Sequence, residues 1–299
     1  MIITLDVYSG RPNPTWLLSQ KDTNRLVERF SDRSVAEAEV VDGVLGFRGL
    51  VVSATSDEQL PEGMPATFRV GGLLPADYSV PELRLRALTE EESDDAVRWL
   101  LSTGEHAIKE DIFAYLEDTL EMRKQSLETE APTELVVEEK IWKEEAKLVA
   151  KAACIIQNTA YNPGYWNAPA VIGKNNCYNY AMNYRSDTFA QPGRISGHPN
   201  SIMACANVAT AANWDGCKTT CSGSNKNVAL VIWPGQDYHW YRKHSNGFWG
   251  HKPGGTAARN TDSLGRIING TRLTPQNCAR GPYTIFCGYR YSPTGMKVR

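Results

Sequence analysis

Alternating apolar and polar positions at the start of the chain predict a small sheet. Residues 2–8 alternate well enough for an opening strand, and the turn-forming run at 9–14, rich in Gly, Pro and Asn, must end it. Residues 45–52 and 66–70 predict further strands, separated by polar loops that contain proline. We expect these strands to belong to a small α/β unit that ends near residue 105.

Apolar residues spaced three and four apart predict helices around and after these strands. The first covers residues 19–30, where Ser19 and Asp22 are placed as a capping box. The second follows Thr89, which precedes three glutamates, and it stops near Gly104.

Two further helices are predicted to follow this unit. One has an apolar face marked by Ile112, Leu116 and Leu120, and the other extends from residue 135 toward 156 with Ile141 on its apolar stripe. Since both are rich in acidic residues, we interpret their polar faces as solvated surfaces.

The last part of the chain has the pattern of an antiparallel meander. Residues 228–233 form the most apolar run and predict a central strand, and residues 239–242 start the return strand. Asn246 and Gly247 suit the positive φ angles of a tight hairpin turn, so residues 248–251 make a third strand. Residues 284–291 supply a last one.

These elements together predict an α+β protein with three parts. Residues 1–105 form a small acidic α/β domain, 106–156 a helical connector, and 157–299 a basic, cysteine-rich domain with an antiparallel sheet.

The charges divide at the same place. Residues 1–150 carry 30 acidic against 16 basic side chains, whereas residues 151–299 carry 4 against 16. Either the acidic half docks on the basic half, or the basic half meets an acidic substrate or surface.

All seven cysteines lie in the basic half. Three bridges and one reactive thiol are the most economical arrangement of an odd number, and bridges imply an oxidising compartment. The N-terminus shows no signal peptide, and no apolar run is long enough to span a membrane. The location therefore stays open, and the cysteine content favours a secreted or injected protein.

Candidate chemistry centres on Cys177, which starts a short helix within residues 175–184. The helix dipole and unpaired amides there favour a thiolate. His239 opens a strand and is the candidate base, and His251 on the next strand would orient its ring. The competing orienters are Asp237 and Asp262. The candidates for a helix cap or oxyanion donor are Asn175 and Asn176.

This order of Cys177, His239 and a polar residue on the next strand resembles that of the papain-like cysteine hydrolases, most nearly the NlpC-type amidases. The resemblance covers about residues 170–255 and is architectural. Tyr178 follows the cysteine where a Ser-Gly pair is common, and His-Trp-Tyr-Arg stands where His-Val-Gly is common.

The resemblance implies cleavage or transfer of an amide through a thioester, in a peptide, peptidoglycan or protein glutamine, with no cofactor and no metal. Trp240, Tyr178 and Arg242 would then contact the substrate. One hypothesis is a toxin-like effector with an acidic N-terminal domain that masks the basic half. It would reconcile cysteine chemistry with an N-terminus that shows no signal peptide.

Two other classes of function stay open. One is a metal-free ribonuclease that uses His239 and His251 as base and acid, with Arg242, Lys243 and Lys252 on the phosphate. The other is a non-enzymatic, disulfide-braced module whose aromatic, basic surface binds a glycan or cell envelope. In that module every cysteine would be paired or unreactive, including Cys177.

Overall fold

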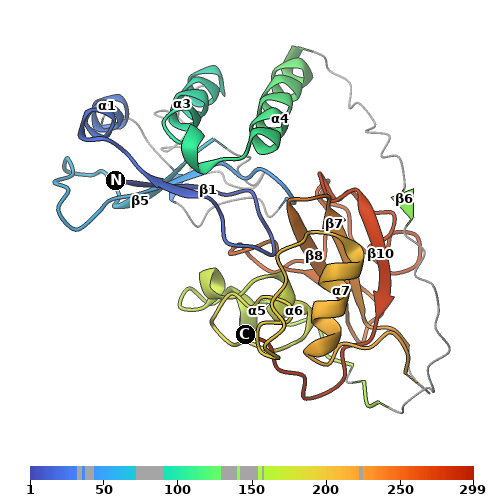
Figure 1. Cartoon of the computed structure of the whole chain (residues 1–299). Coiled ribbons are helices and arrows are strands. Elements are labelled where there is room, and N and C mark those ends of the chain that lie inside the picture. Colours follow the sequence, from blue (N-terminus) through green and yellow to red (C-terminus); the bar gives the residue numbers. More distant parts are fainter. Residues whose placement is uncertain are drawn as a thin grey trace. The chain divides into compact units, whose positions relative to one another are not determined.

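The computed structural model describes residues 1–31, 36–37, 44–71, 90–128, 140–141, 154–156, 158–221 and 225–299. The chain forms two compact units (Figure 1). The second unit includes two short segments from the beginning of the chain, and the domain boundaries expected near residues 105 and 156 stay predictions. Unit 1 comprises Met1–Val7, Asn13–Asp42 and Phe47–Val136, and unit 2 comprises Tyr8–Pro12, Gly43–Gly46 and Val137–Arg299.

The first unit is built on an antiparallel sheet of strand order β2-β1-β4-β5-β3. Alternate residues of the central strands are fully buried, including Ile3, Leu5, Leu50 and Val52. This period of two places one face of each strand against the core. The strands are β1 (Ile2–Leu5), β2 (Thr15–Leu17), β3 (Ala36–Glu37), β4 (Leu50–Ser53) and β5 (Thr67–Val70).

The main helices of this unit lie on one side of its sheet (Figure 1). They are α1 (Gln20–Phe30), α3 (Glu90–Ser102) and α4 (Glu110–Glu128), with a 3-10 turn η1 (Glu105–Ala107) between the last two. The predicted cap is confirmed, because Ser19 Oγ accepts a hydrogen bond from the Asp22 amide at 3.1 Å. The predicted apolar face of α4 is also confirmed, since its members Ile112, Leu116 and Leu120 are fully buried.

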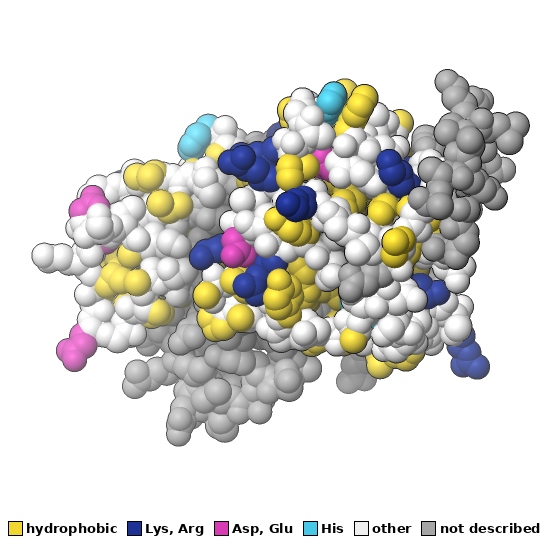
Figure 2. Space-filling view, turned by 90° about the horizontal axis from the view of Figure 1, so that it is seen from below, with side chains coloured by type: hydrophobic (Ala, Val, Ile, Leu, Met, Phe, Trp, Pro, Cys, Tyr) yellow, Lys and Arg dark blue, Asp and Glu magenta, His cyan; other side chains and the backbone are white. Residues whose placement is uncertain are grey.

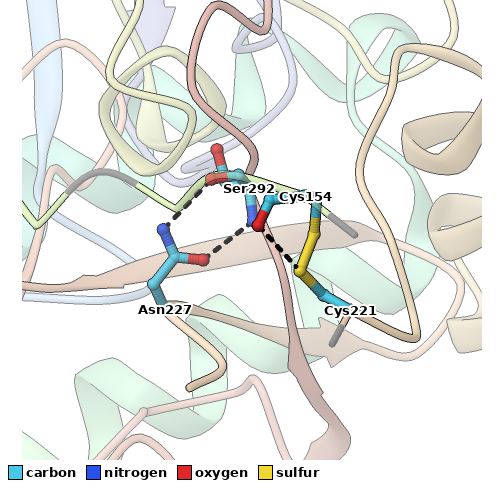
Figure 3. The surroundings of a disulfide bond; sticks show 4 residues. All are labelled: Cys154, Cys221, Asn227 and Ser292. Atoms are coloured by element: carbon cyan, nitrogen blue, oxygen red, sulfur yellow. Dashed lines mark hydrogen bonds between the residues drawn. A yellow bond between two sulfur atoms is a disulfide. The ribbon is translucent and has the colours of Figure 1, made fainter. Parts of the chain in front are cut away.

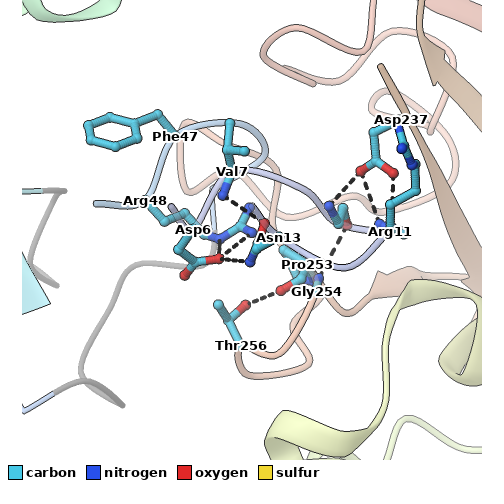
Figure 4. A network of polar contacts seen from close by, with 12 residues as sticks. Asp6, Val7, Arg11, Asn13, Phe47, Arg48, Asp237, Pro253, Gly254 and Thr256 are labelled. Carbon is cyan, nitrogen blue, oxygen red and sulfur yellow. Dashed lines mark hydrogen bonds and ion pairs between the residues drawn. The ribbon is translucent and has the colours of Figure 1, made fainter. Parts of the chain in front are cut away.

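A buried ion cluster follows β1. The Asp6 carboxylate accepts hydrogen bonds from Arg48 Nη2 at 2.7 Å and from the side chain of Asn13 at 3.0 Å (Figure 4). Arg69 Nη1 donates to its other oxygen at 3.0 Å. Burial alone would raise the pKa of Asp6, but the two guanidinium charges outweigh it and lower this pKa to about 2. The carboxylate therefore stays ionised inside the unit.

Replacing Asp6 with Asn is expected to destabilise the first unit strongly. It leaves Arg48 and Arg69 buried without their counter-charge, which costs on the order of 3–5 kcal/mol in comparable pairs. Because the folded pKa is depressed, the stabilisation is present above about pH 4 and is lost as the pH falls toward 2. Urea unfolding from pH 7 to pH 2 measures this.

The matched control for that variant is Asp57→Asn on the exposed surface, which should change stability by less than about 0.5 kcal/mol. Equal effects of Asp6→Asn and Asp57→Asn would contradict the ion-cluster argument.

The second unit contains a five-stranded sheet of order β6-β10-β7-β8-β9. All its pairs are antiparallel except that between β6 and β10. The predicted meander is confirmed: β7 is central, every residue of it is buried, and β8 and β9 follow it in order. The strands are β6 (Lys140–Ile141), β7 (Val228–Trp233), β8 (Asp237–Lys243), β9 (Trp249–His251) and β10 (Ile285–Arg290).

Short helices cover one face of this sheet. The helix α6 (Cys177–Ala181) packs on β8, and α7 (Cys205–Trp214) packs on β7. Their apolar residues share one core with the alternate strand residues Val228, Leu230 and Ile232. Two further short helical segments precede them, α5 (Pro163–Asn167) and η2 (Ile172–Lys174).

Two disulfides brace the second unit, one between Cys205 and Cys287 and the other between Cys154 and Cys221. The first joins the start of α7 to β10. Near the second, the amide of Asn227 exchanges two hydrogen bonds with the backbone of Ser292 (Figure 3). The predicted count of three bridges and one free thiol is wrong, because three cysteines are free and all three are buried at separate places.

The helix predicted from residue 135 toward 156 is wrong where it can be tested. Residues 140–141 form β6, which pairs with β10 in register Ile285 to Lys140, and residues 154–156 are not helical. A free sheet edge offers unpaired backbone groups, so pairing there overrides the helical periodicity. The other residues of the predicted helix lie outside the described residues.

The coarse fold class, α+β with two sheets, is confirmed. A papain-like arrangement of the second unit stays a prediction. No helix in the described ranges is both apolar and long enough for a membrane span. Figure 2 shows Lys and Arg side chains scattered over the face in view, with hydrophobic side chains between them.

Candidate functional site

The start of α6 is fixed by an asparagine. Asn176 is the N-cap, and its Oδ1 accepts from the amides of Tyr178 and Asn179, both at 3.1 Å. Its Nδ2 donates to the carbonyls of Gly10 and Ala190, both at 2.7 Å. The neighbouring Asn175 side chain bonds to Val171 and Asp187 instead, so only Asn176 caps the helix.

Cys177 follows this cap and is completely buried. Its Sγ lies 3.9 Å from the carbonyl oxygen of Tyr238. Burial raises the pKa of the Cys177 thiol well above its usual range, and the nearby charge of Asp237 raises it further. The helix start therefore does not produce the thiolate that the sequence predicts.

His239 faces the other side of the sheet from α6. Tyr238 and Trp240 share the core of Cys177, so the side chain between them points away, as alternation in a strand requires. The His239 ring packs against Tyr241, His251 and Tyr283.

A hydrogen-bonded chain passes through this ring. Ser9 Oγ lies 2.5 Å from His239 Nδ1, His239 Nε2 lies 2.8 Å from His251 Nδ1, and His251 Nε2 lies 2.7 Å from the carbonyl oxygen of Thr261. The Thr261 carbonyl can only accept, so His251 Nε2 donates to it, and a neutral His251 then accepts at Nδ1 from His239 Nε2.

Burial lowers the pKa of His251 to about 3, which agrees with that proton arrangement. Against the burial that raises the pKa of the Cys177 thiol, the Ser9 side chain acts to lower it. Ser9 therefore interacts with both the thiol and the imidazole that the sequence pairs directly.

Asp237 anchors the turn that supplies Ser9. Its carboxylate accepts from the amides of Ser9 at 2.6 Å, Gly10 at 3.0 Å and Arg11 at 3.0 Å (Figure 4). The hydroxyl of Tyr283 donates to it at 2.6 Å. Asp237 thus holds the turn in place by accepting from its backbone amides, and it does not orient the ring of His239.

Asp262, the other candidate orienter, serves a different turn. It accepts from the side chain of Arg266 at 2.8 Å and from the amides of Leu264 and Ala279, both at 3.0 Å.

The three predicted substrate contacts are buried. Tyr178 and Trp240 are 0% exposed, and Arg242 is 3% exposed. Tyr178 donates to Asp215 at 2.9 Å, and Arg242 Nη1 donates to the carbonyl of Ala181 at 2.7 Å. These side chains stabilise the interior of the second unit.

Sequence reasoning missed Ser9, Tyr283 and the structural role of Lys252. The ammonium of Lys252, fully buried, donates to the carbonyls of Ile172 at 2.5 Å and Asn175 at 2.6 Å. The only available signal was the dense turn chemistry at residues 9–14, which indicates a fixed turn and says nothing of its distant partner.

No family model matches the chain, and no solved structure matches it. Insoluble matrix shell protein 1 of Ruditapes philippinarum is 42% identical over 142 residues, which are 46% of this chain and 93% of the shell protein. This chain belongs to the family of that shell protein.

Membership of this family overturns the enzyme predictions. The cysteine peptidase or amidase assignment is wrong, since the relative is named as a shell matrix protein. The geometry supplies the reason, because the Cys177 thiol is buried and protonated and both ring nitrogens of His239 are engaged. The toxin-like and masking hypotheses depended on that assignment. The ribonuclease alternative needs accessible histidines, yet His239 and His251 are 0% and 1% exposed.

Neutral buried histidines predict a loss of stability in mild acid. The folded pKa of His251 is about 3 and that of His244 about 4, against an ordinary value of 6.5. The unfolded chain therefore binds more protons below pH 6.5, and each histidine lowers the free energy of unfolding by up to about 1.4 kcal/mol per pH unit. Urea unfolding at pH 7, 6, 5 and 4.5, followed by tryptophan fluorescence, measures the slope.

In the variant His251→Gln, the free energy of unfolding is expected to fall less steeply as the pH is lowered. The difference is the contribution of one histidine, because glutamine does not titrate. His198→Gln, at an exposed histidine, is the matched control and should keep the wild-type slope. If His251→Gln shows the same pH dependence as the wild type, His251 is not one of the neutral buried histidines that cause it.

Proposed function

We propose that this chain is a non-enzymatic structural protein of an insoluble extracellular matrix. The observation that carries the proposal is the 42% identity across 93% of insoluble matrix shell protein 1. Two disulfides agree with an oxidising, extracellular setting. A secreted location is part of this proposal.

The interior of the second unit supports a structural role. The Asp237 carboxylate accepts hydrogen bonds from four donors. The series of hydrogen bonds from Ser9 through His239 and His251 ends on the backbone carbonyl of Thr261. A polar network with its members satisfied is rigid and specifies one arrangement of the core. Such a network stabilises a protein that must keep its shape outside the cell.

The thiols of the folded protein are expected to be unreactive. Cys177, Cys217 and Cys278 are at most 6% exposed, and burial raises the pKa of Cys217 to about 12 and that of Cys278 to about 11. Titration with a chromogenic disulfide should find no fast thiol in native protein at pH 8 and three in guanidinium without reductant. Rapid alkylation of Cys177 in the native protein would contradict the structural role.

Retention in an insoluble matrix tests the function directly. The purified chain of residues 1–299 is incubated with the organic residue left after acid decalcification of Ruditapes philippinarum shell, and is then washed with high salt. We expect most of the folded chain to remain bound. The reduced and alkylated chain, which lacks both disulfides, is the matched control and should wash off. Equal release of both forms would overturn the proposal.

A further inference from the structure

The second unit has a surface pocket whose lining residues do not include Ser9, His239 or Asp237. Its volume is 370 Å³, near the lower end of the range of about 300–1,000 Å³ for small-molecule sites. One wall comes from residues 158–166, which extend into α5, and the other from residues in and just after α6 and at the end of β8. This size suits a single sugar ring or a group of similar dimensions.

Aromatic rings form a connected wall in this pocket. Tyr165, which is 48% exposed, meets Trp166 edge to face at 5.4 Å, and Trp166 packs on Tyr180 at 5.3 Å. The guanidinium of Arg185 lies over the Tyr165 ring at 4.5 Å and also donates to the Tyr165 carbonyl at 2.9 Å. The exposed ring is therefore held in place before any ligand arrives, which reduces the entropy lost on binding.

Amide groups accompany this wall. The side chains of Asn158 and Asn183 line the pocket and, within the ranges that the structure describes, have no hydrogen-bond partner. Asn183 has a positive φ of 53°, and its backbone N–H donates to the carbonyl of Tyr180 at 3.0 Å, so the backbone that carries this side chain is fixed. An amide offers both donors and acceptors, as the hydroxyl groups of a sugar require.

The pocket carries little charge. Among the described residues that line it there is no acidic side chain and one guanidinium, that of Arg242, which already donates to Thr159 Oγ1 at 3.1 Å and to the carbonyl of Ala181. His244 accepts from the Tyr180 hydroxyl at 2.7 Å and donates to the Thr159 carbonyl at 3.3 Å. Burial lowers the pKa of His244 to about 4, so the imidazole is neutral above that pH.

We infer that this pocket binds a neutral sugar unit of a polysaccharide, with the ring of Tyr165 against the apolar face of the sugar and Asn158 and Asn183 on its hydroxyl groups. A sugar ring presents C–H bonds on its faces and hydroxyl groups at its rim, which match an electron-rich aromatic face beside free amides. The inference deepens the proposed matrix role, on which it rests, by naming the class of polymer that the protein holds.

Calorimetric titration of the chain of residues 1–299 tests this. The probes are tetramers of β-linked glucose, tetramers of β-linked N-acetylglucosamine, and chondroitin sulfate as the anionic polymer. At least one neutral tetramer should bind with a Kd below about 1 mM. Tyr165→Ala should weaken that binding about tenfold or more, and Tyr165→Phe, which keeps the ring, should restore it.

The matched control is Trp214→Ala, which removes another exposed aromatic side chain, 59% exposed on α7 and outside the pocket. It should bind as the wild type does. The inference is overturned if no neutral tetramer binds at millimolar concentration, if Tyr165→Ala binds like the wild type, or if Trp214→Ala weakens binding equally. It is also overturned if only chondroitin sulfate binds.

Failure of this inference and failure of the matrix function are distinguishable. The titration uses soluble sugars and does not depend on retention by shell matrix. Retention with no tetramer binding would overturn the pocket inference alone. Tetramer binding with no retention would overturn the matrix role and leave the pocket chemistry in place.

Discussion

The carboxylate of Asp237 is the interaction on which the second unit depends. It lies at the start of β8 and binds three consecutive backbone amides of the Tyr8–Pro12 turn, at 2.6 to 3.0 Å. Successive amides that point at one anion form a strong, charge-assisted site. Because the turn is held there, the Ser9 hydroxyl reaches His239, and the hydrogen-bonded chain continues through His251 to a backbone carbonyl.

The same arrangement explains why residues with the composition of a catalytic site do not form one. A thiol and an imidazole react when they meet each other and water or substrate, whereas here Ser9 occupies Nδ1 of His239 and burial disfavours the thiolate of Cys177. Histidines locked as neutral donors and acceptors contribute stability near neutral pH and lose it in acid. The chemistry of these side chains is used to fix a fold.

Polar groups in the second unit therefore have two separate uses. Those around Asp237 are buried and saturated, and they determine the position of a segment from the beginning of the chain. Those around Tyr165 border a pocket, where the side-chain amides of Asn158 and Asn183 have no hydrogen-bond partner among the described residues. Disulfides at Cys205 and Cys154 hold the scaffold that carries both regions.

The sequence by itself determined the features that arise within a few residues. The Ser19 cap, the buried run of β7 and the hairpin after β8 all follow from local hydrogen bonds and side-chain periodicity, and so does the α+β class. Only the tertiary structure decided the disulfide partners, the pairing of β6 with β10, and the contact of Ser9 with His239, which are 230 positions apart. Contacts between distant segments depend on how all the elements pack, and no local pattern carries that information. The position of Cys177 at the start of α6 predicted a thiolate, but burial in the folded core keeps the thiol protonated.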